Sequence, residues 1–352
     1  MKQYYALIFS TTNKNINNFS NSIIHNFQNK FLFIKIKLIN NCNLHCQMCN
    51  HWQQSNEPLL SIDFYKTVVD ELALLGCKRI HFTGGEPLLY PKLEKLIKYI
   101  KNKGIKATLT SNATLIDNEK AVSLVKSGLK KINISIDSPI AEIHDKIRGN
   151  KGYWEKAVDG LSNIRPYVKH LDLNVVINSI NYKSLVTLPD FAMQLGVNNI
   201  NLIPIYEHTP DIGCLTVEQI QEYNKNIAPI MLQKALEYNL VENESEIFIF
   251  GTTTKEVEES SLGNYSHGYY KTNNCYVPWT HSTIDFSGNV KICCKINEPI
   301  LGNLKKESFT DIWNGITYNK LRTNENMPIS KQCKGCLMFA KSNLKINEML
   351  NK

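Results

Sequence analysis

The stretch FLFIKIKLINNCNLHCQMC, residues 31–49, joins two patterns that together decide the fold. In its first half, Ile34, Ile36 and Leu38 alternate with lysines, which is typical of a strand with one buried face and one wetter face. Three cysteines follow at once, spaced C-x3-C-x2-C. A strand that runs directly into crowded thiols predicts a metal or cluster site at its carboxyl end.

The segment after this stretch alternates strand-like and helix-like runs. The strand-like runs cover residues 79–85, 106–112, 131–137, 171–178 and 199–205. Helices are expected over residues 64–75, 92–103, 118–126, 154–164 and 185–195. Six strand-helix units of this kind predict parallel strands joined by right-handed crossovers. The expected fold is therefore α/β, a partial (β/α)6 TIM-like barrel with its chemistry at the carboxyl ends of the strands.

The composition excludes several classes of protein. With 352 residues and 43% hydrophobic residues, the chain is long enough to bury a substantial core. The net charge of +8 comes from dispersed lysines, which favours a solvated surface over a nucleic-acid-binding one. The sequence shows no signal-peptide pattern and no apolar run long enough for a membrane span, so we expect a cytoplasmic protein. In that reducing compartment, ten cysteines favour metal ligands or redox thiols over disulfides.

Three clustered cysteines without a fourth favour one kind of cofactor. A structural zinc site takes four ligands, whereas three cysteines on a [4Fe–4S] cluster leave one iron open to a small molecule. The C-x3-C-x2-C spacing after a first strand resembles that of the radical S-adenosylmethionine (SAM) superfamily. The resemblance implies that Cys42, Cys46 and Cys49 hold the cluster and that SAM chelates the open iron. Met48 stands where the family often has an aromatic residue, and it can still shield the cluster from water.

Other motifs at the strand ends also resemble this superfamily. FTGGEPLLYP closes the second strand, TSNAT closes the third, and SIDSPIAEIHDKIRG follows the fourth. The resemblance implies a SAM site that contains Gly84, Gly85, Glu86, Asn112, Ser135 and Arg148. By this resemblance Glu86 accepts from the SAM amino group, Ser135 lies near the ribose and Arg148 binds the carboxylate. Taken singly, each residue could equally be a structural cap or part of an ion pair.

A second group of cysteines lies near the end of the sequence. Cys275, Cys293 and Cys294 belong to CYVPWTHSTIDFSGNVKICC, and Cys333 and Cys336 form the pair in CKGC. Two single positions and a C-x2-C pair supply four thiolates, enough for a zinc ion or an iron-sulfur cluster. For an isolated module of this kind, zinc would be favoured.

After a radical SAM barrel, this arrangement instead resembles the SPASM/Twitch extension, in which a glycine lies a fixed distance before the second cysteine. Four residues separate Gly288 from Cys293, so the resemblance assigns Cys293 as a ligand and leaves the role of Cys294 open. It implies one auxiliary [4Fe–4S] cluster held by Cys275, Cys293, Cys333 and Cys336. We expect one cluster because no cysteine follows CKGC.

The sequence divides into four expected parts: an extension over 1–30, the radical SAM barrel over 31–210, a helical linker and loop over 211–270, and a small cysteine-rich α+β domain over 271–345. The resemblance covers about residues 33–340. A long helix is expected from Val217 to about Tyr238, followed by a polar stretch without clear periodicity. The first thirty residues are shorter than the leader-peptide-binding domain of many peptide maturases.

By resemblance, the chain reductively cleaves SAM to a 5′-deoxyadenosyl radical that abstracts hydrogen from a substrate, with flavodoxin or ferredoxin as electron donor. Three functions remain open: oxidation or epimerisation of a small sugar- or cyclitol-like molecule, modification of a peptide, and non-catalytic metal binding. Cys214 follows the sixth strand and is a candidate hydrogen donor for epimerisation, against an inert loop thiol. Packing is favoured for Cys77, and packing or hydrogen bonding is at least as well supported as catalysis for His51, Trp52, His208 and His281.

Overall fold

Six parallel strands form the first part of a single curved sheet, as the sequence predicts. The computed structural model describes residues 32–49, 52, 58–205, 212–271, 273, 275–296, 299–323, 330–337, 343 and 346. The parallel strands are β1 Phe33–Ile39, β2 Arg79–Gly84, β3 Lys106–Ser111, β4 Lys131–Ser135, β5 His170–Ile177 and β6 Asn199–Pro204. Each pairs with the next in chain order, so the expected α/β partial barrel is confirmed.

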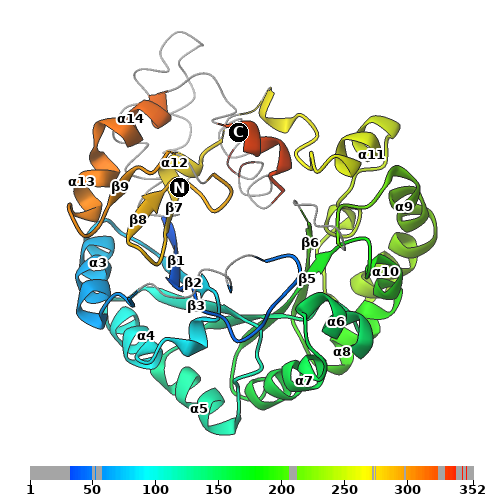
Figure 1. The fold of residues 1–352 in the computed structure, drawn as a ribbon, viewed down its shortest axis with the longest axis horizontal. Coiled ribbons are helices and arrows are strands. Elements are labelled where there is room, and N and C mark those ends of the chain that lie inside the picture. Colours follow the sequence, from blue (N-terminus) through cyan, green and yellow to red (C-terminus); the bar gives the residue numbers. More distant parts are fainter. Residues whose placement is uncertain are drawn as a thin grey trace, which may run out of the picture.

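Helices cover the outside of these strands (Figure 1). They are α3 Ile62–Leu74, α4 Leu93–Asn102, α5 Asn118–Ser127, α6 Ala141–Arg148, α7 Tyr153–Ile164 and α8 Leu188–Gln194, with 3-10 turns η3 Pro87–Leu89 and η4 Tyr182–Thr187. The single helix expected over 185–195 is instead a 3-10 turn followed by α8. Pro189 lies in the first turn of α8, where its missing N–H leaves no hydrogen bond unmade. Helix α6 was not predicted from the sequence.

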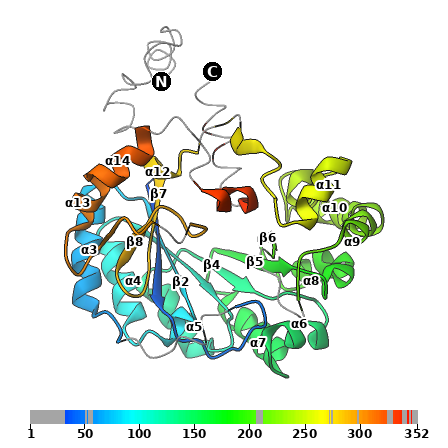
Figure 2. The ribbon, with the colours of Figure 1, turned by 45° about the horizontal axis from the view of Figure 1, so that its top comes forward.

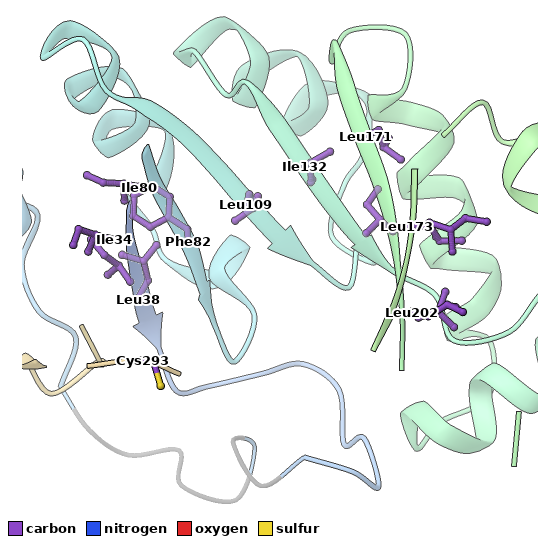
Figure 3. Packing of buried hydrophobic residues seen from close by; sticks show 14 of the residues in the cluster. Ile34, Leu38, Ile80, Phe82, Leu109, Ile132, Leu171, Leu173, Leu202 and Cys293 are labelled. Carbon is purple, nitrogen blue, oxygen red and sulfur yellow. The ribbon is translucent and has the colours of Figure 1, made fainter. Parts of the chain in front are cut away.

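The core lies between the sheet and these helices. Ile34 and Ile36 of β1 are 0% exposed, and the intervening lysines face the opposite side of the sheet. Figure 3 shows the same helix-facing layer continuing through Ile80, Leu109 and Ile132 on the neighbouring strands. The period-two alternation in the sequence therefore separates a dry outer layer from a polar inner face.

The C-terminal cysteine-rich part continues the same sheet. Strand β7 His281–Ile284 pairs in parallel with β1, and β8 Asn289–Lys291 and β9 Gly302–Asn303 follow in antiparallel order. Helices α12 Val277–Thr280, α13 Phe309–Asn314 and α14 Ile316–Thr323, with the 3-10 turn η8 Lys331–Gly335, complete this part. Figure 2 shows α13 beside α3, where the Thr310 amide donates to Glu71 Oε2 at 3.0 Å.

The segment before β7 is more helical than its sequence suggests. The long helix expected from Val217 is present as α9 Val217–Glu222, a π-helical turn over Tyr223–Ile227 and α10 Ala228–Glu237. The polar stretch after it contains 3-10 turns over Glu244–Glu246 and Tyr269–Lys271 and helix α11 Thr254–Ser261. A capping box of Thr253 and Glu256 begins α11; its T-x-x-E spacing is visible in the sequence, but this helix was not predicted from it. In the described part of the chain, no helix is long and apolar enough to cross a bilayer.

Replacing Leu109 by alanine should test the helix-facing layer. Leu109 is 0% exposed, so Leu109→Ala removes buried methyl groups and leaves a cavity. We expect the free energy of unfolding to fall by about 2–5 kcal/mol. Urea unfolding followed by circular dichroism measures it. Leu74 is 89% exposed on α3, and Leu74→Ala should change the free energy by less than about 0.5 kcal/mol. Equal losses in the two variants would contradict this layer.

Candidate active site

The loop that carries the first three cysteines is held by its backbone against the turn after β2. The Gly85 amide donates to the Ile39 carbonyl at 2.7 Å, and the Glu86 amide donates to the Asn41 carbonyl at 2.9 Å. A Cβ atom on Gly84 would lie 2.2 Å from Ile39 O, and one on Gly85 would lie 2.0 Å from Asn41 O. Both glycines are therefore needed for this close approach, which ends one residue before Cys42.

Helix α6 holds the loop from its other side. The Gln47 amide donates to the Ile147 carbonyl at 3.0 Å. Gly149 ends the helix with φ +84°, and a Cβ atom there would lie 2.3 Å from the His45 carbonyl oxygen. A residue with a side chain would be strained at this positive φ, and its Cβ would overlap the His45 carbonyl oxygen. The cysteine loop is thus held between two turns that contain glycine, one after β2 and one after α6.

Side chains complete the attachment through Asn43. Asn112 at the end of β3 donates from Nδ2 to Asn43 Oδ1 at 2.9 Å, and Asn43 donates in turn to Thr114 Oγ1 at 2.8 Å. The Tyr153 hydroxyl donates to the Asn43 carbonyl at 3.1 Å. Asn112 Nδ2 also lies 4.0 Å from Cys42 Sγ. Sequence reasoning missed Asn43 and Tyr153, because no spacing signal connects these positions.

Glu86 is a buried carboxylate held by three donors. It is 1% exposed and accepts from the Leu88 amide at 3.0 Å, the Ser111 hydroxyl at 2.9 Å and the Asn112 amide at 2.8 Å. Burial raises the pKa of Glu86 to about 7, and the three hydrogen bonds partly offset that rise. This carboxylate therefore orients the end of β3, and with it the Asn112 side chain that contacts the cysteine loop.

Arg148 and Asp137 form a buried ion pair beside Cys46. Arg148 Nε lies 2.6 Å from Asp137 Oδ2, and its Nη1 lies 3.9 Å from Cys46 Sγ. Asp137 also accepts from the Val176 amide at 2.8 Å. Burial raises the pKa of the Cys46 thiol, and the Arg148 charge lowers it in part. Arg148 is thus oriented toward the cysteine loop, while Ser135 lies half-buried at the end of β4.

The three cysteines suit a cluster ligated by thiolates. They are free thiols at the carboxyl end of β1, and the Cys49 amide donates to the Cys46 carbonyl at 3.1 Å within a tight turn. Burial raises the pKa of Cys42 to about 11, so a metal must displace its proton on binding. Within the described ranges, no three His, Cys, Asp or Glu side chains converge on a single metal ion. A four-iron cluster, which is larger than one ion, does not require that convergence.

The second cysteine group surrounds one pocket. The predicted ligands Cys275, Cys293, Cys333 and Cys336 all line it, together with Tyr270, Val277, Ile292, Lys295 and Ile296. Burial raises the pKa of Cys275 to about 12, and the Tyr270 hydroxyl lies 3.3 Å from Cys336 Sγ. Cys294 is partly exposed and is not one of the lining residues. Four thiols around one apolar pocket fit a cluster, and Tyr270 is a pocket residue that the sequence did not predict.

The remaining thiols and histidines lie apart from these sites or outside the described residues. Cys214 is 6% exposed; it lies 3.3 Å from the Ile205 carbonyl and accepts from the Tyr265 hydroxyl at 3.3 Å. Cys77 is buried, as expected. His281 is also buried, with Nδ1 at 2.9 Å from the Phe33 carbonyl, and the Trp52 ring packs 4.9 Å from the His45 ring. His51 and His208 lie outside the described residues.

The inner face of the sheet, opposite the helices, is polar. His81 bridges two hydroxyls, with Nδ1 2.8 Å from Thr108 and Nε2 2.9 Å from Thr110. Asn201 on β6 donates to Asn174 on β5 at 3.0 Å. In closed (β/α)8 barrels, branched apolar side chains usually fill this position. Here the inner face offers hydroxyl, amide and imidazole groups on strands β2, β3, β5 and β6.

Comparisons with known proteins match two parts of the chain to known families. Residues 36–192 match the model of the radical SAM superfamily, and residues 275–337 match the SPASM iron-sulfur cluster-binding domain. An AdoMet-dependent heme synthase of Methanosarcina barkeri is 25% identical over 318 residues, covering 84% of this chain and 88% of the relative. A PqqA peptide cyclase of Rhodopseudomonas palustris is 30% identical over 162 residues, covering 45% of this chain and 42% of the relative.

A solved structure shares the fold. Streptococcus suis SuiB bound to S-adenosylmethionine superposes with a TM-score of 0.67 at 17% identity, covering 95% of this chain and 80% of that one.

Gly85→Ala should separate the cysteine loop from the turn after β2. The added Cβ would overlap the Asn41 carbonyl, so one of the two backbones must move. We expect the reconstituted variant to lose about half of its iron, the share of one of two four-iron clusters. Iron and sulfide analysis measures this. Gly104→Ala is the control: its φ of +75° makes the alanine cost some stability, but a Cβ there meets nothing within 4 Å, so the variant should retain all of the iron. Full iron content in Gly85→Ala would contradict the role of this contact.

The metal content should also distinguish the two cysteine groups. Anaerobically reconstituted protein should hold about eight irons and eight sulfides, the content of two four-iron clusters. Replacing Cys42, Cys46 and Cys49 together by alanine should remove about half of each. Zinc without sulfide at Cys275, Cys293, Cys333 and Cys336 would show that the second group is a zinc site.

Proposed function

Because the chain belongs to the radical SAM superfamily and carries a SPASM iron-sulfur domain, we propose that it oxidises a polar small molecule by abstracting a hydrogen atom from a C–H bond. The observation that carries this proposal is the cysteine loop, clamped at the end of β1 beside an inner face made of polar side chains. A one-electron donor such as flavodoxin or ferredoxin, in a reducing cytoplasm, would serve this chemistry.

The residues near the loop have distinct tasks in this proposal. Cys42, Cys46 and Cys49 would hold the SAM-binding cluster, and Cys275, Cys293, Cys333 and Cys336 the auxiliary one. When bound, these groups and SAM supply a 5′-deoxyadenosyl radical and a one-electron acceptor. Glu86 and Asn112 position the loop, and Arg148 places a positive charge next to Cys46. Gly84, Gly85 and Ser135 complete the proposed SAM site.

A small substrate is supported by the chemistry of the inner face. Its hydroxyl and amide groups suit a ligand that carries several hydroxyls, such as a sugar or cyclitol, because each group can donate and accept. Peptide modification is the second candidate, and the similarity to a peptide cyclase over 45% of the chain favours it. The two candidates differ in the class of substrate and share the same initial hydrogen abstraction.

Oxidation is favoured over epimerisation by the surroundings of Cys214. An epimerase needs a hydrogen donor that reaches the substrate radical, and Cys214 was the candidate. Its sulfur lies 3.3 Å from the Ile205 carbonyl, receives the Tyr265 hydroxyl and is 6% exposed. A thiol with this burial and these partners suits a structural role better than contact with substrate.

The first test determines both which reaction the enzyme catalyses and which class of substrate it acts on. Reconstituted enzyme, SAM and dithionite should form 5′-deoxyadenosine, and the variant with Cys42, Cys46 and Cys49 replaced by alanine should form none. In deuterated water, the enzyme is then incubated separately with a small-molecule extract and with a peptide fraction. Mass spectrometry should find, in the small-molecule arm, a product lighter by two hydrogens and without deuterium.

Each other outcome of this test has a defined meaning. A product that gains one deuterium, and disappears with Cys214→Ala, would show epimerisation and contradict the proposed oxidation. A product in the peptide arm alone would establish the second candidate. Failure of the wild-type protein to form 5′-deoxyadenosine would overturn the proposed activity as a whole.

A further inference from the structure

Lysines occupy the inner face of the sheet near β1. Backbone register places Lys35 opposite His81 of β2 on one side and Thr283 of β7 on the other, and Thr283 pairs with Lys291 of β8. Residues paired across strands point to the same face of a sheet. Lys35 and Lys291 therefore share one row of the inner face, and Lys37 lies one row nearer the cysteine loop.

Two other lysines of this face have acidic partners. Lys131 on β4 forms an ion pair with Asp172, and Lys291 forms one with Asp285 at 3.4 Å. Asp285 additionally accepts from the Asn289 amide at 3.0 Å. The acidic groups of this region are thus occupied by other residues.

Lys35 and Lys37 differ from these two lysines. Both are half-buried, and neither ammonium group forms a hydrogen bond or salt bridge with another side chain in the ranges that the structure describes. Burial lowers the pKa of Lys37. Cys294 and, less strongly, Asp285 raise it, while the nearby charges of Lys291 and Lys35 lower it further. A half-buried ammonium without a partner costs stability unless it binds an anion.

We propose that Lys35 and Lys37 bind an anionic group of the substrate, a carboxylate or a phosphate. The two residues lie on the same face of β1, about 6.6 Å apart along the strand, so both ammonium groups can reach one anion. Strand β1 leads directly into the cysteine loop, and Cys293 lies near its carboxyl end (Figure 3). The anion would therefore anchor the substrate between the two cysteine groups. This inference rests on the proposed function and adds the charge of its substrate.

A different explanation is that the lysines balance the charge of the auxiliary site. Lys37 interacts electrostatically with Cys294, the neighbour of the pocket residue Cys293. In that case, removing the lysine charge should change the potential of the auxiliary cluster and leave anion binding as it was. The two explanations therefore differ in a measurable quantity.

Binding of simple anions tests the proposal without SAM or reductant. Isothermal titration calorimetry on the reconstituted full chain would use inorganic phosphate in one arm and succinate in the other. Lys35→Met and Lys37→Met should each weaken the binding of the preferred probe by about ten- to a hundredfold, the effect of a lost hydrogen bond to a charged group. Lys37→Arg should retain most of the affinity because it keeps the charge.

The control is Lys98→Met, which removes an exposed lysine from α4 on the outer side of the barrel. It should leave the affinity unchanged. A preference for phosphate or for succinate, if it depends on the lysines, supports the proposal and identifies the anion. The proposal is overturned if the wild type binds neither probe, if binding is independent of Lys35 and Lys37, or if the variants change only the auxiliary-cluster potential. Formation of 5′-deoxyadenosine, measured separately, shows whether the proposed activity stands when anion binding does not.

Discussion

The contact between two backbones, the turn after β2 and the chain just before Cys42, is the constraint on which the site depends. Glycines at positions 84 and 85 bring peptide groups so close that no Cβ would fit, and hydrogen bonds of 2.7 and 2.9 Å join them. The position of the cysteine loop is therefore set by main chain, which moves less than side chains do. Glu86, the next residue, extends the same attachment to β3 through its buried carboxylate.

Arg148 shows how one residue can serve both packing and chemistry. Its ion pair with Asp137 is buried, and such pairs are stable only when their remaining hydrogen-bonding groups find partners. The second carboxylate oxygen of Asp137, Oδ1, accepts from the Val176 amide, and the Asn181 side chain donates to the Asp137 backbone carbonyl. The network thus connects β4, β5 and α6 to the side of the loop that carries Cys46. Stability of the barrel and orientation of the site come from the same contacts.

The sequence predicted what is periodic or closely spaced. Alternation in β1 identified its buried face, cysteine spacing identified both thiol groups, and the α/β partial barrel and the radical SAM superfamily were both confirmed. Contacts between distant segments were not predictable: Tyr153 reaches Asn43 across 110 positions, and nothing in either neighbourhood indicates the other. The pairing of β7 with β1 was missed for the same reason, since a four-residue strand has no pattern that names its neighbour. The assignment of individual SAM ligands stays a prediction.

The pairing of β1 with β7 also affects how the protein is made. His281 and Phe33 contact each other although 248 positions separate them in the chain. During synthesis, β1 therefore leaves the ribosome long before β7 exists to cover its edge, and an open strand edge can pair with other chains. Such long-range closure is slow because the loop entropy must be overcome before the contact forms. Because the second cysteine group flanks β7 in the chain, we expect cluster insertion there to follow this late pairing.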